Sequence, residues 1–296
     1  MMELFRFGFG AMGCSCEVVA VSPSKAVALA GAEAAIDEIG RIERKYSRYL
    51  PDSVVSGINA QAGIGRVECD EETMSLLRHA SSLYEQSGGL FDLTSGVLRR
   101  AWDFDRQLLP EQGVLDGLLE LVGWNKVEFD ERSVFLMRSG MEIDLGGIGK
   151  EYAADRAADI LFAKGIRHGY VNLAGDIRLV GLKPDGVPWS IGVRDPRNEE
   201  KMMASVPMYR GALATSGDYE RFMDVGGRRY CHILDPHTGY PPDFWRSVTV
   251  IAPSALEAGS CTTITMLKGK DGIDYLDASG LMYLAVDCSG RVYHKN

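Results

Sequence analysis

Apolar residues recur every three or four positions in four segments of the chain, which is the spacing of an amphipathic helix. The first helix is predicted to follow a cap at Ser24 or a neighbouring residue, and the second to begin after Asp70 and to end at Gly88-Gly89. The other two are predicted over residues 149–164 and 255–267.

The remaining segments are mostly β-prone and short. A glycine turn over residues 8–13 precedes a strand at 14–21, and further strands are predicted at 134–137, 170–173, 177–180, 189–193, 206–208, 247–251 and 281–286. Helices gather early and strands late, with gaps of hairpin length. We therefore expect an α+β fold with largely antiparallel sheets packed by helices, in a single domain over residues 1–296.

Residues Gly8 to Gly13 spell G-x-G-x-x-G, the spacing of a dinucleotide-binding turn. That motif needs a helix after the turn, because the helix N-terminus binds the pyrophosphate. Here a β-prone segment follows and ends at Ser22-Pro23. We interpret the match as accidental.

Composition narrows the function classes. The chain has 296 residues, 46% of them hydrophobic and 25% charged, with a net charge of −9, which argues against nucleic-acid and anionic-membrane binding. No apolar run approaches the roughly 18 residues of a membrane span, and no signal peptide is visible. The expected location is cytoplasmic, or exported or lipid-anchored if an N-terminal signal was trimmed. The six cysteines lack C-x-x-C pairs, which favours free thiols over a zinc site.

Four glycine-containing loops carry reactive side chains: "EIDLGGIGKEYAAD", "VNLAGDIRLVG", "ALATSGDYERF" and "YCHILDPHTGYPP". In the first, Asp144 is predicted at a strand end and Lys150 in the first turn of a helix. That arrangement suits either a phosphate site or a glycine-rich turn with a surface lysine. It is not a Walker A loop, because Glu151 stands where Ser or Thr would bind Mg²⁺. His232 in the last loop is either an acid, base or anion donor, or a structural histidine.

Taken together, the sequences of these loops and their order along the chain resemble those of the ApbE family, flavin transferases that move FMN from FAD onto a hydroxyl of an acceptor protein. The resemblance runs from Met12-Gly13 and "YSRY", through "GLFDLTSGVL", to "VTVIAPSALEA", and so covers nearly the whole chain. It implies an ApbE-like fold, related to the T-fold.

The resemblance also implies which residues contact FAD. For Tyr49, Phe91 and Ile233, core packing is the alternative role. The matching positions are Met12, Tyr49, Leu90, Phe91, Asp92, Asp144, Lys150 and Ile233.

The chemistry implied by the family is phosphoryl transfer with release of AMP, in which His232 and Lys150 are the candidates for positioning or charge stabilisation. Mg²⁺ suits this reaction because it binds carboxylate and phosphate oxygens. By resemblance the metal lies on the carbonyl of Gly147 and on Thr263, together with an aspartate.

At the aspartate position, however, this chain has Gly259. Glu151 replaces the usual glycine after the lysine, and Ala174 replaces the first glycine before Asp176. With no anionic ligand at position 259, Mg²⁺ binding is expected to be weak or absent. Glu257 would substitute only if the start of the helix were rearranged.

Three functions therefore stay open at this stage. The first is transfer of FMN to an acceptor flavoprotein with a short Asp-x-x-Thr or Ser motif. The second is a non-catalytic FAD-binding relative that acts as a carrier or assembly factor, and the third is an FAD pyrophosphatase. Covalent labelling of an acceptor, or release of free FMN without one, separates them.

Overall fold

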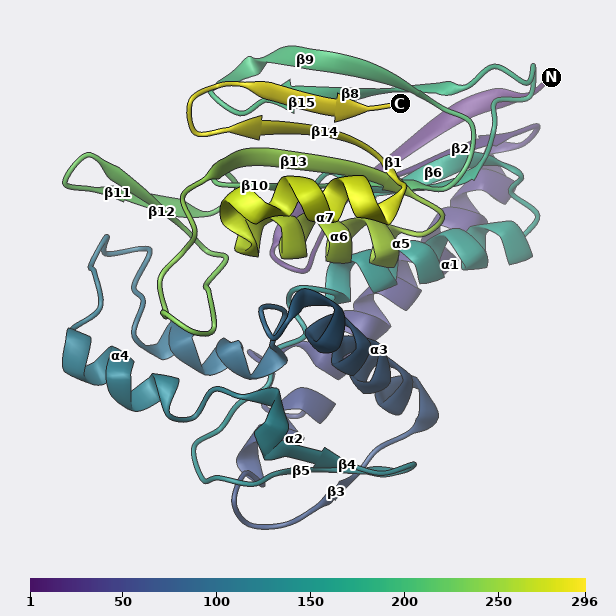
Figure 1. The fold of residues 1–296 in the computed structure, drawn as a ribbon. Helices are drawn as coiled ribbons and strands as arrows, with labels where there is room; N and C mark the ends of the chain where they lie inside the picture. The colour runs from purple at the N-terminus through teal and green to yellow at the C-terminus, as the bar shows by residue number, and fades with distance from the viewer.

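The computed structural model describes residues 1–296, apart from the side chain of Glu199. Its centre is an eight-stranded sheet in which each described strand pairs antiparallel with its neighbours (Figure 1). The order across this sheet is β1 (Glu3–Ala11), β2 (Cys14–Ser22), β6 (His168–Leu173), β7 (Asp176–Gly181), β10 (Ala212–Gly217), β13 (Trp245–Ala252), β14 (Met282–Asp287) and β15 (Val292–Lys295).

The two faces of the sheet are covered differently. A hairpin of β8 (Trp189–Asp195) and β9 (Asn198–Met208) lies on one face, where Trp189 packs with residues such as Val19. Helices cover the other face: α1 (Lys25–Tyr46), α5 (Gly149–Ala163), α6 (Ala255–Leu267) and α7 (Gly272–Ser279) (Figure 1).

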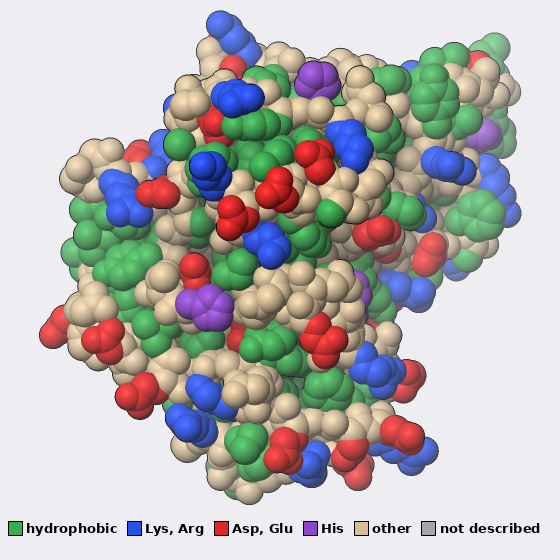
Figure 2. All heavy atoms as spheres, viewed as in Figure 1, with side chains coloured by type: hydrophobic (Ala, Val, Ile, Leu, Met, Phe, Trp, Pro, Cys, Tyr) green, Lys and Arg blue, Asp and Glu red, His purple; other side chains and the backbone are tan. Residues whose placement is uncertain are grey.

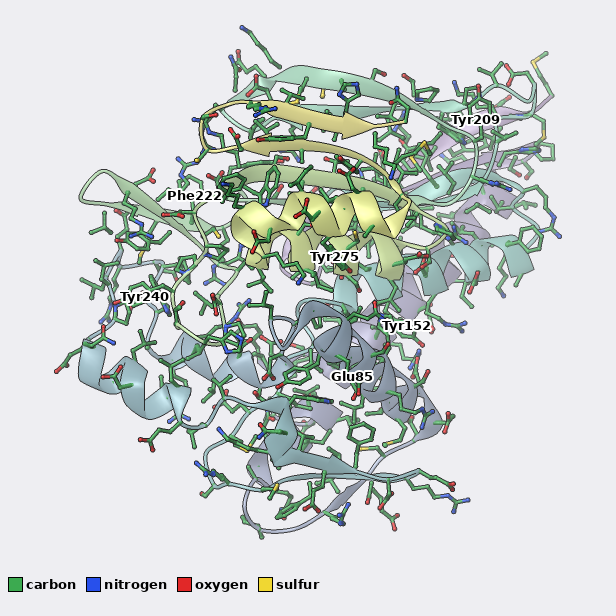
Figure 3. The ribbon with its side chains drawn as sticks, viewed as in Figure 1. Glu85, Tyr152, Tyr209, Phe222, Tyr240 and Tyr275 are labelled. Carbon is green, nitrogen blue, oxygen red and sulfur yellow. The ribbon has the colours of Figure 1, made fainter. Side chains whose placement is uncertain are left out.

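Beyond these helices lies a second layer of short elements (Figure 1). In the loop after β12, the Tyr240 hydroxyl donates to Gln112 Oε1 of α4 at 3.5 Å and so links the two layers (Figure 3). The remaining elements are α2 (Val54–Ala60), α3 (Glu71–Ser87), η1 (Leu93–Arg100), α4 (Gln112–Leu119), η2 (Trp124–Lys126), η3 (Gly269–Asp271), the small sheet β3 (Val67–Glu68), β5 (Ser133–Leu136) and β4 (Val127–Phe129), and the hairpin β11 (Phe222–Val225) and β12 (Arg228–Cys231).

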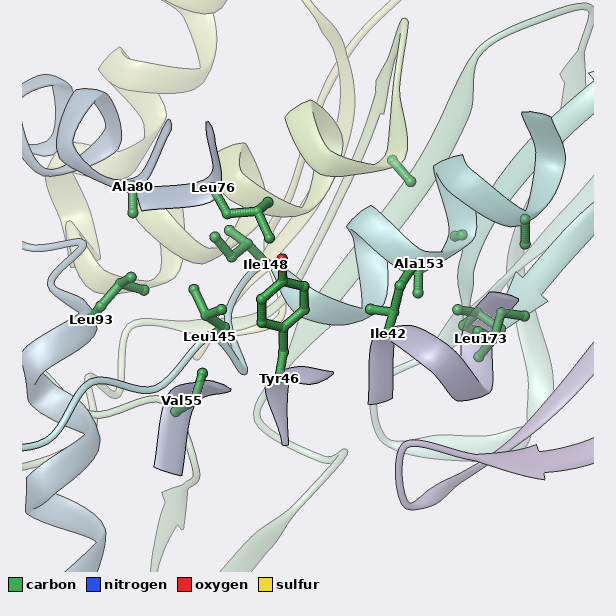
Figure 4. Close-up of a cluster of buried hydrophobic side chains, with 14 of the residues drawn as sticks. Ile42, Tyr46, Val55, Leu76, Ala80, Leu93, Leu145, Ile148, Ala153 and Leu173 are labelled. Atoms are coloured by element: carbon green, nitrogen blue, oxygen red, sulfur yellow. The ribbon is translucent and has the colours of Figure 1, made fainter. Parts of the chain in front are cut away.

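The largest core joins the two layers. Ile42 and Tyr46 of α1 pack with Leu76 of α3 and with Ile148 just before α5 (Figure 4). The Tyr46 hydroxyl lies 3.2 Å from Thr73 Oγ1, so its polar end is paired although the ring is buried.

The α+β expectation is confirmed, and the four predicted helices form close to their expected ends. Asp70 caps α3 by accepting from Thr73 N at 3.0 Å, and Gly88 ends it with a left-handed φ of 71°. Capping residues are local signals, which is why these boundaries were readable from the sequence.

The glycine turn predicted over residues 8–13 is wrong in its extent. Gly8 and Gly10 lie inside β1, paired with Glu17 and Ser15 of β2, and only Met12 and Gly13 make the turn, with φ of 53° and 73°. Because a strand follows the turn, the G-x-G-x-x-G match is indeed accidental.

Two other local expectations are also corrected. Asp144 follows a segment that pairs with no strand, rather than a strand end, and its backbone N–H donates to the carbonyl of Leu93. The "ALATSGDYERF" loop begins with the central strand β10, which small residues such as Ala212 and Ala214 fill. Small side chains carry little β-propensity, so the sequence pattern missed it.

None of the helices in the described part of the chain is both long and apolar enough to cross a membrane. On the face seen in Figure 2, acidic and basic side chains are interspersed.

Candidate functional site

A cleft with a free volume of about 1030 Å³, counting its open mouth, collects residues from distant parts of the chain. The lining residues come from the segments 90–99, 144–151, 174–176, 215–220, 232–234 and 263–267.

Most of the residues singled out in the sequence meet in this cleft, whereas Met12 and Tyr49 are not among its lining. The Met12 backbone N–H donates to Glu43 Oε1 at 2.8 Å. The Tyr49 side chain is 71% exposed, with the Arg48 guanidinium 5.9 Å from its ring centre. Those that line the cleft are Leu90, Phe91, Asp92, Asp144, Gly147, Lys150, His232, Ile233 and Thr263.

The Asp92 carboxylate holds one wall of the cleft in place. It accepts from Thr94 N at 2.8 Å, from Thr94 Oγ1 at 2.6 Å and from Trp124 N at 2.9 Å. Burial raises the pKa of Asp92 despite these three donors. Since its oxygens are occupied by protein donors, Asp92 fixes the loop that carries Phe91, whose ring lies against Gly147.

Asp144 and the turn that follows it form the floor beside α5. Asp144 Oδ1 accepts from Gly146 N at 2.8 Å, and Oδ2 lies 3.4 Å from Arg48 Nη1 and 3.6 Å from Arg99 Nε. The turn at Gly146 and Gly147 leads directly into α5, as predicted. The carboxylate therefore sets the shape of this turn and holds the cation Arg99 at the cleft.

Lys150 in the first turn of α5 is fixed by Asp176. The Nζ atom lies 2.9 Å from Asp176 Oδ2, and Asp176 is only 3% exposed. Burial alone would lower the pKa of Lys150, but the charge of Asp176, that of Glu151 and the hydrogen bond to Asp176 together raise it. Lys150 is thus a permanent, well-oriented cation. Asp176 begins β7 after the left-handed residues Ala174 and Gly175.

His232 presents a neutral imidazole to the cleft. Its Nδ1 lies 3.3 Å from the carbonyl oxygen of Arg221, which suits a neutral ring that donates from Nδ1 and keeps a lone pair on Nε2. Burial and the positive charge of Arg99 lower the pKa of His232 to about 4. The ring is therefore neutral at neutral pH.

Glu151, next to Lys150, is a buried acid at the same site. Its side chain is 6% exposed, and burial together with the charge of Asp176 raises the pKa of Glu151 to about 8. Among the described residues, its Oε2 atom has no hydrogen-bond partner. Sequence reasoning noted Glu151 only as a departure from a pattern. The signal that would have found it is the second departure, Gly259, whose Cα faces the Glu151 side chain.

The chain is similar in sequence to known proteins. A sequence model of the ApbE family matches residues 12–285. A protein from Treponema pallidum named FAD:protein FMN transferase is 32% identical over 281 residues, which span 87% of this chain and 77% of that protein.

Two solved structures share the fold over nearly the full length. The crystal structure of the ApbE protein from Thermotoga maritima has a TM-score of 0.92 and 35% identity, covering 99% of this chain and 97% of that one. The flavin transferase ApbE from Vibrio cholerae has a TM-score of 0.85 and 26% identity, covering 100% and 98%.

Proposed function

The chain belongs to the ApbE family, and on that premise we propose that it transfers FMN from FAD to a Thr or Ser hydroxyl of an acceptor flavoprotein, with release of AMP. The observation that carries the proposal is the meeting of Lys150 and His232, from segments far apart in the sequence, in one cleft. The whole chain is proposed to act as a single domain, because the cleft draws on segments from both halves.

FAD is proposed to lie along the cleft, against Leu90, Phe91 and Ile233, with its pyrophosphate near Lys150. The first turn of α5 supports this placement, because N–H groups at a helix start, together with a lysine, attract phosphate. Met12 and Tyr49 are proposed to contact the parts of FAD that extend beyond the cleft lining. Phe91 is 4% exposed, so it serves the core as well as the ligand.

His232 is proposed to remove the proton from the acceptor hydroxyl. The oxygen of that hydroxyl forms a bond to the FMN-side phosphorus, the bond to the bridging oxygen breaks, and AMP leaves. A histidine with a pKa near 4 is a weak base in the free protein. The negative charge of a bound pyrophosphate raises that basicity, because it stabilises the imidazolium.

Lys150 is proposed to stabilise the negative charge on the pyrophosphate oxygens during transfer. Its ammonium is held by Asp176 before any ligand arrives, so little reorganisation is needed when charge develops. Arg99, at the same cleft, adds a second cation. Alignment of the acceptor hydroxyl with the phosphorus atom is proposed to provide the remaining rate enhancement, because a loose phosphoryl-transfer transition state requires mainly positioning.

The oxygen atoms at the cleft also fit Mg²⁺. Thr263, the carbonyl of Gly147 and the unpartnered carboxylate oxygen of Glu151 belong to the same lining, and such hard oxygen donors suit this ion. The described residues contain no group of three or more His, Cys, Asp or Glu that would hold a metal by themselves. The phosphates of FAD would therefore complete the ligand set. When bound, the ion would neutralise phosphate charge.

The test is covalent labelling of an acceptor domain that carries an Asp-x-x-Thr motif. The protein is incubated with FAD and Mg²⁺, denatured, and examined for in-gel flavin fluorescence and for a mass gain of FMN less one water. The expected result is a fluorescent acceptor and release of AMP, with no label when the acceptor Thr is replaced by Val.

A dark acceptor would refute the proposal if the Vibrio cholerae transferase labels the same acceptor in parallel. Free FMN released without any acceptor would instead show hydrolysis by water.

A further inference from the structure

Glu151 is a buried carboxylate that faces the cleft without a protein partner for Oε2 among the described residues. Burying a polar oxygen without a hydrogen-bond partner is costly, so a carboxyl group that is only 6% exposed normally has partners for both of its oxygens. The nearest cation in sequence, Lys150, is engaged by Asp176 at 2.9 Å. The protein therefore leaves an oxygen donor available inside the cleft.

The register between α5 and α6 fixes what lies opposite this carboxylate. Asp155 of α5 accepts from the first backbone N–H groups of α6, Ala255 N at 2.8 Å and Leu256 N at 2.9 Å. One turn back along α5 from Asp155 is Glu151, and one turn on along α6 from Ala255 is Gly259. The two helices therefore bring positions 151 and 259 face to face.

These two positions share a single space. A Cβ atom placed on Gly259 would lie 2.4 Å from Glu151 Cγ and 2.7 Å from Glu151 Oε1. Glycine within a helix costs about 1 kcal/mol relative to alanine, so its presence in α6 has a steric cause here. The side chain that reaches this part of the cleft can come from α5 or from α6, but not from both.

Two other oxygen donors belong to the same neighbourhood. Thr263 lies one turn after Gly259 and so on the same side of α6, and the carbonyl of Gly147 precedes α5 by two residues; both line the cleft. A carboxylate, a hydroxyl and a carbonyl are the ligand types that Mg²⁺ accepts.

We propose that Glu151 is the anionic protein ligand of a Mg²⁺ ion in this cleft, and that it occupies the place of an aspartate side chain at position 259. The carboxylate absent from α6 is thus supplied by α5, from the other side of the same space. This inference rests on the proposed function, because FAD phosphates complete the coordination. It replaces the expectation that Mg²⁺ binding is weak for want of an anionic ligand, and it makes a rearrangement that recruits Glu257 unnecessary.

The test measures metal affinity without any acceptor protein. Mn²⁺ binding is followed by electron paramagnetic resonance, with metal alone and with FAD, and Mg²⁺ binding by calorimetry. Loss of a group that merely supports a ligand weakens metal binding about 10- to 100-fold, so Glu151→Gln is expected to weaken it at least about 10-fold. The matched control is Glu257→Gln, an exposed residue of α6, which is expected to bind metal like the wild type.

A structural role for Glu151 predicts a different result. Among the described residues, Glu151 Oε2 makes no hydrogen bond that the substitution would break, so metal-free Glu151→Gln is expected to melt no lower than the wild type. A variant that both melts lower and binds metal weakly would overturn the proposal. Unchanged metal affinity in Glu151→Gln would overturn it as well.

The decisive variant moves the carboxylate back across the space. Glu151→Gly alone is expected to lose affinity, and Glu151→Gly combined with Gly259→Asp to recover most of it. A doubly substituted protein that is as stable as the wild type but binds metal no better than Glu151→Gly would refute the exchange. A wild type that binds Mn²⁺ through Glu151 yet labels no acceptor would refute the transfer reaction alone.

Discussion

Replacing Asp92 tests whether one buried carboxylate holds the wall of the cleft. In the structure it accepts three hydrogen bonds, two from Thr94 and one from Trp124, with the residue only 7% exposed. Asp92→Ala leaves three donors without a partner. At about 1 kcal/mol for each unsatisfied donor, the expected loss in free energy of unfolding is about 3 kcal/mol.

Asp92→Asn provides the graded comparison. Its amide oxygen can still accept from Thr94, while its NH₂ group cannot accept from Trp124 N, so about one hydrogen bond is lost. Burial raises the pKa of Asp92, which shows that the buried charge itself carries a cost that the amide avoids. The expected loss is therefore about 1 kcal/mol.

The assay is urea denaturation followed by tryptophan fluorescence, since Trp124 lies beside the substituted residue. A slope that matches the wild type is needed to compare the free energies. A loss below about 1 kcal/mol for the alanine variant, or equal losses for both variants, would refute the assignment of Asp92 as the residue that fixes the loop.

Three further predictions concern the ligand. With a pKa of about 4, the His232 ring is expected to stay neutral from pH 8 down to about pH 5. Because this pKa lies below that of an unfolded histidine, acidification is expected to lower the stability of the fold. A His232 ring resonance that titrates near pH 6.5 by NMR would contradict this prediction. Lys150→Met is expected to leave Asp176 unpaired and to cost about 2 kcal/mol, less than for a fully buried pair because the Lys150 side chain is 36% exposed. Adding Asp176→Asn should restore stability but not FMN transfer, and recovery of both would show that Lys150 has only a structural role. Tyr49→Ala is expected to weaken FAD binding by a factor of about 5 or more in a fluorescence titration, the worth of one aromatic stacking contact, while the melting temperature stays unchanged because the ring is exposed; undiminished affinity would remove Tyr49 from the binding site.

The parts of the fold that were predictable are those with local signals. Asp70 marks a helix start through its side-chain cap and Gly88 marks the end of that helix through its left-handed backbone, while Ser24 is at the start of α1 without a side-chain cap bond. The strand β10 was missed because its alanine and glycine residues suit its crowded position between neighbouring strands of the sheet. Those neighbouring strands are distant in sequence, so the residues next to β10 in the chain do not reveal it. Gly8 and Gly10 misled for the opposite reason, since glycine also occurs in strands whose neighbours leave open space.

The site residues Lys150 and His232 were predictable because each is a reactive side chain within a single glycine-containing loop of the sequence. The relation between Glu151 and Gly259 was not, because the two residues are far apart in the chain and only the docking of α6 on Asp155 brings them together. Each looked like an isolated departure in the sequence. In the structure the two departures are linked, because the Glu151 side chain fills the space that a side chain at position 259 would occupy.

The dispersed origin of the cleft also bears on how the protein reaches its working form. Its walls come from segments that start at Leu90 and end at Leu267, so no early fragment of the chain contains them all. Contacts so distant in sequence form late in folding, after the loop entropy between them has been lost. Only a completely folded chain would therefore bind FAD in the cleft. At a concentration about 100 times its dissociation constant, FAD would add about 2.7 kcal/mol to the stability of the finished protein while leaving interrupted chains to proteolysis.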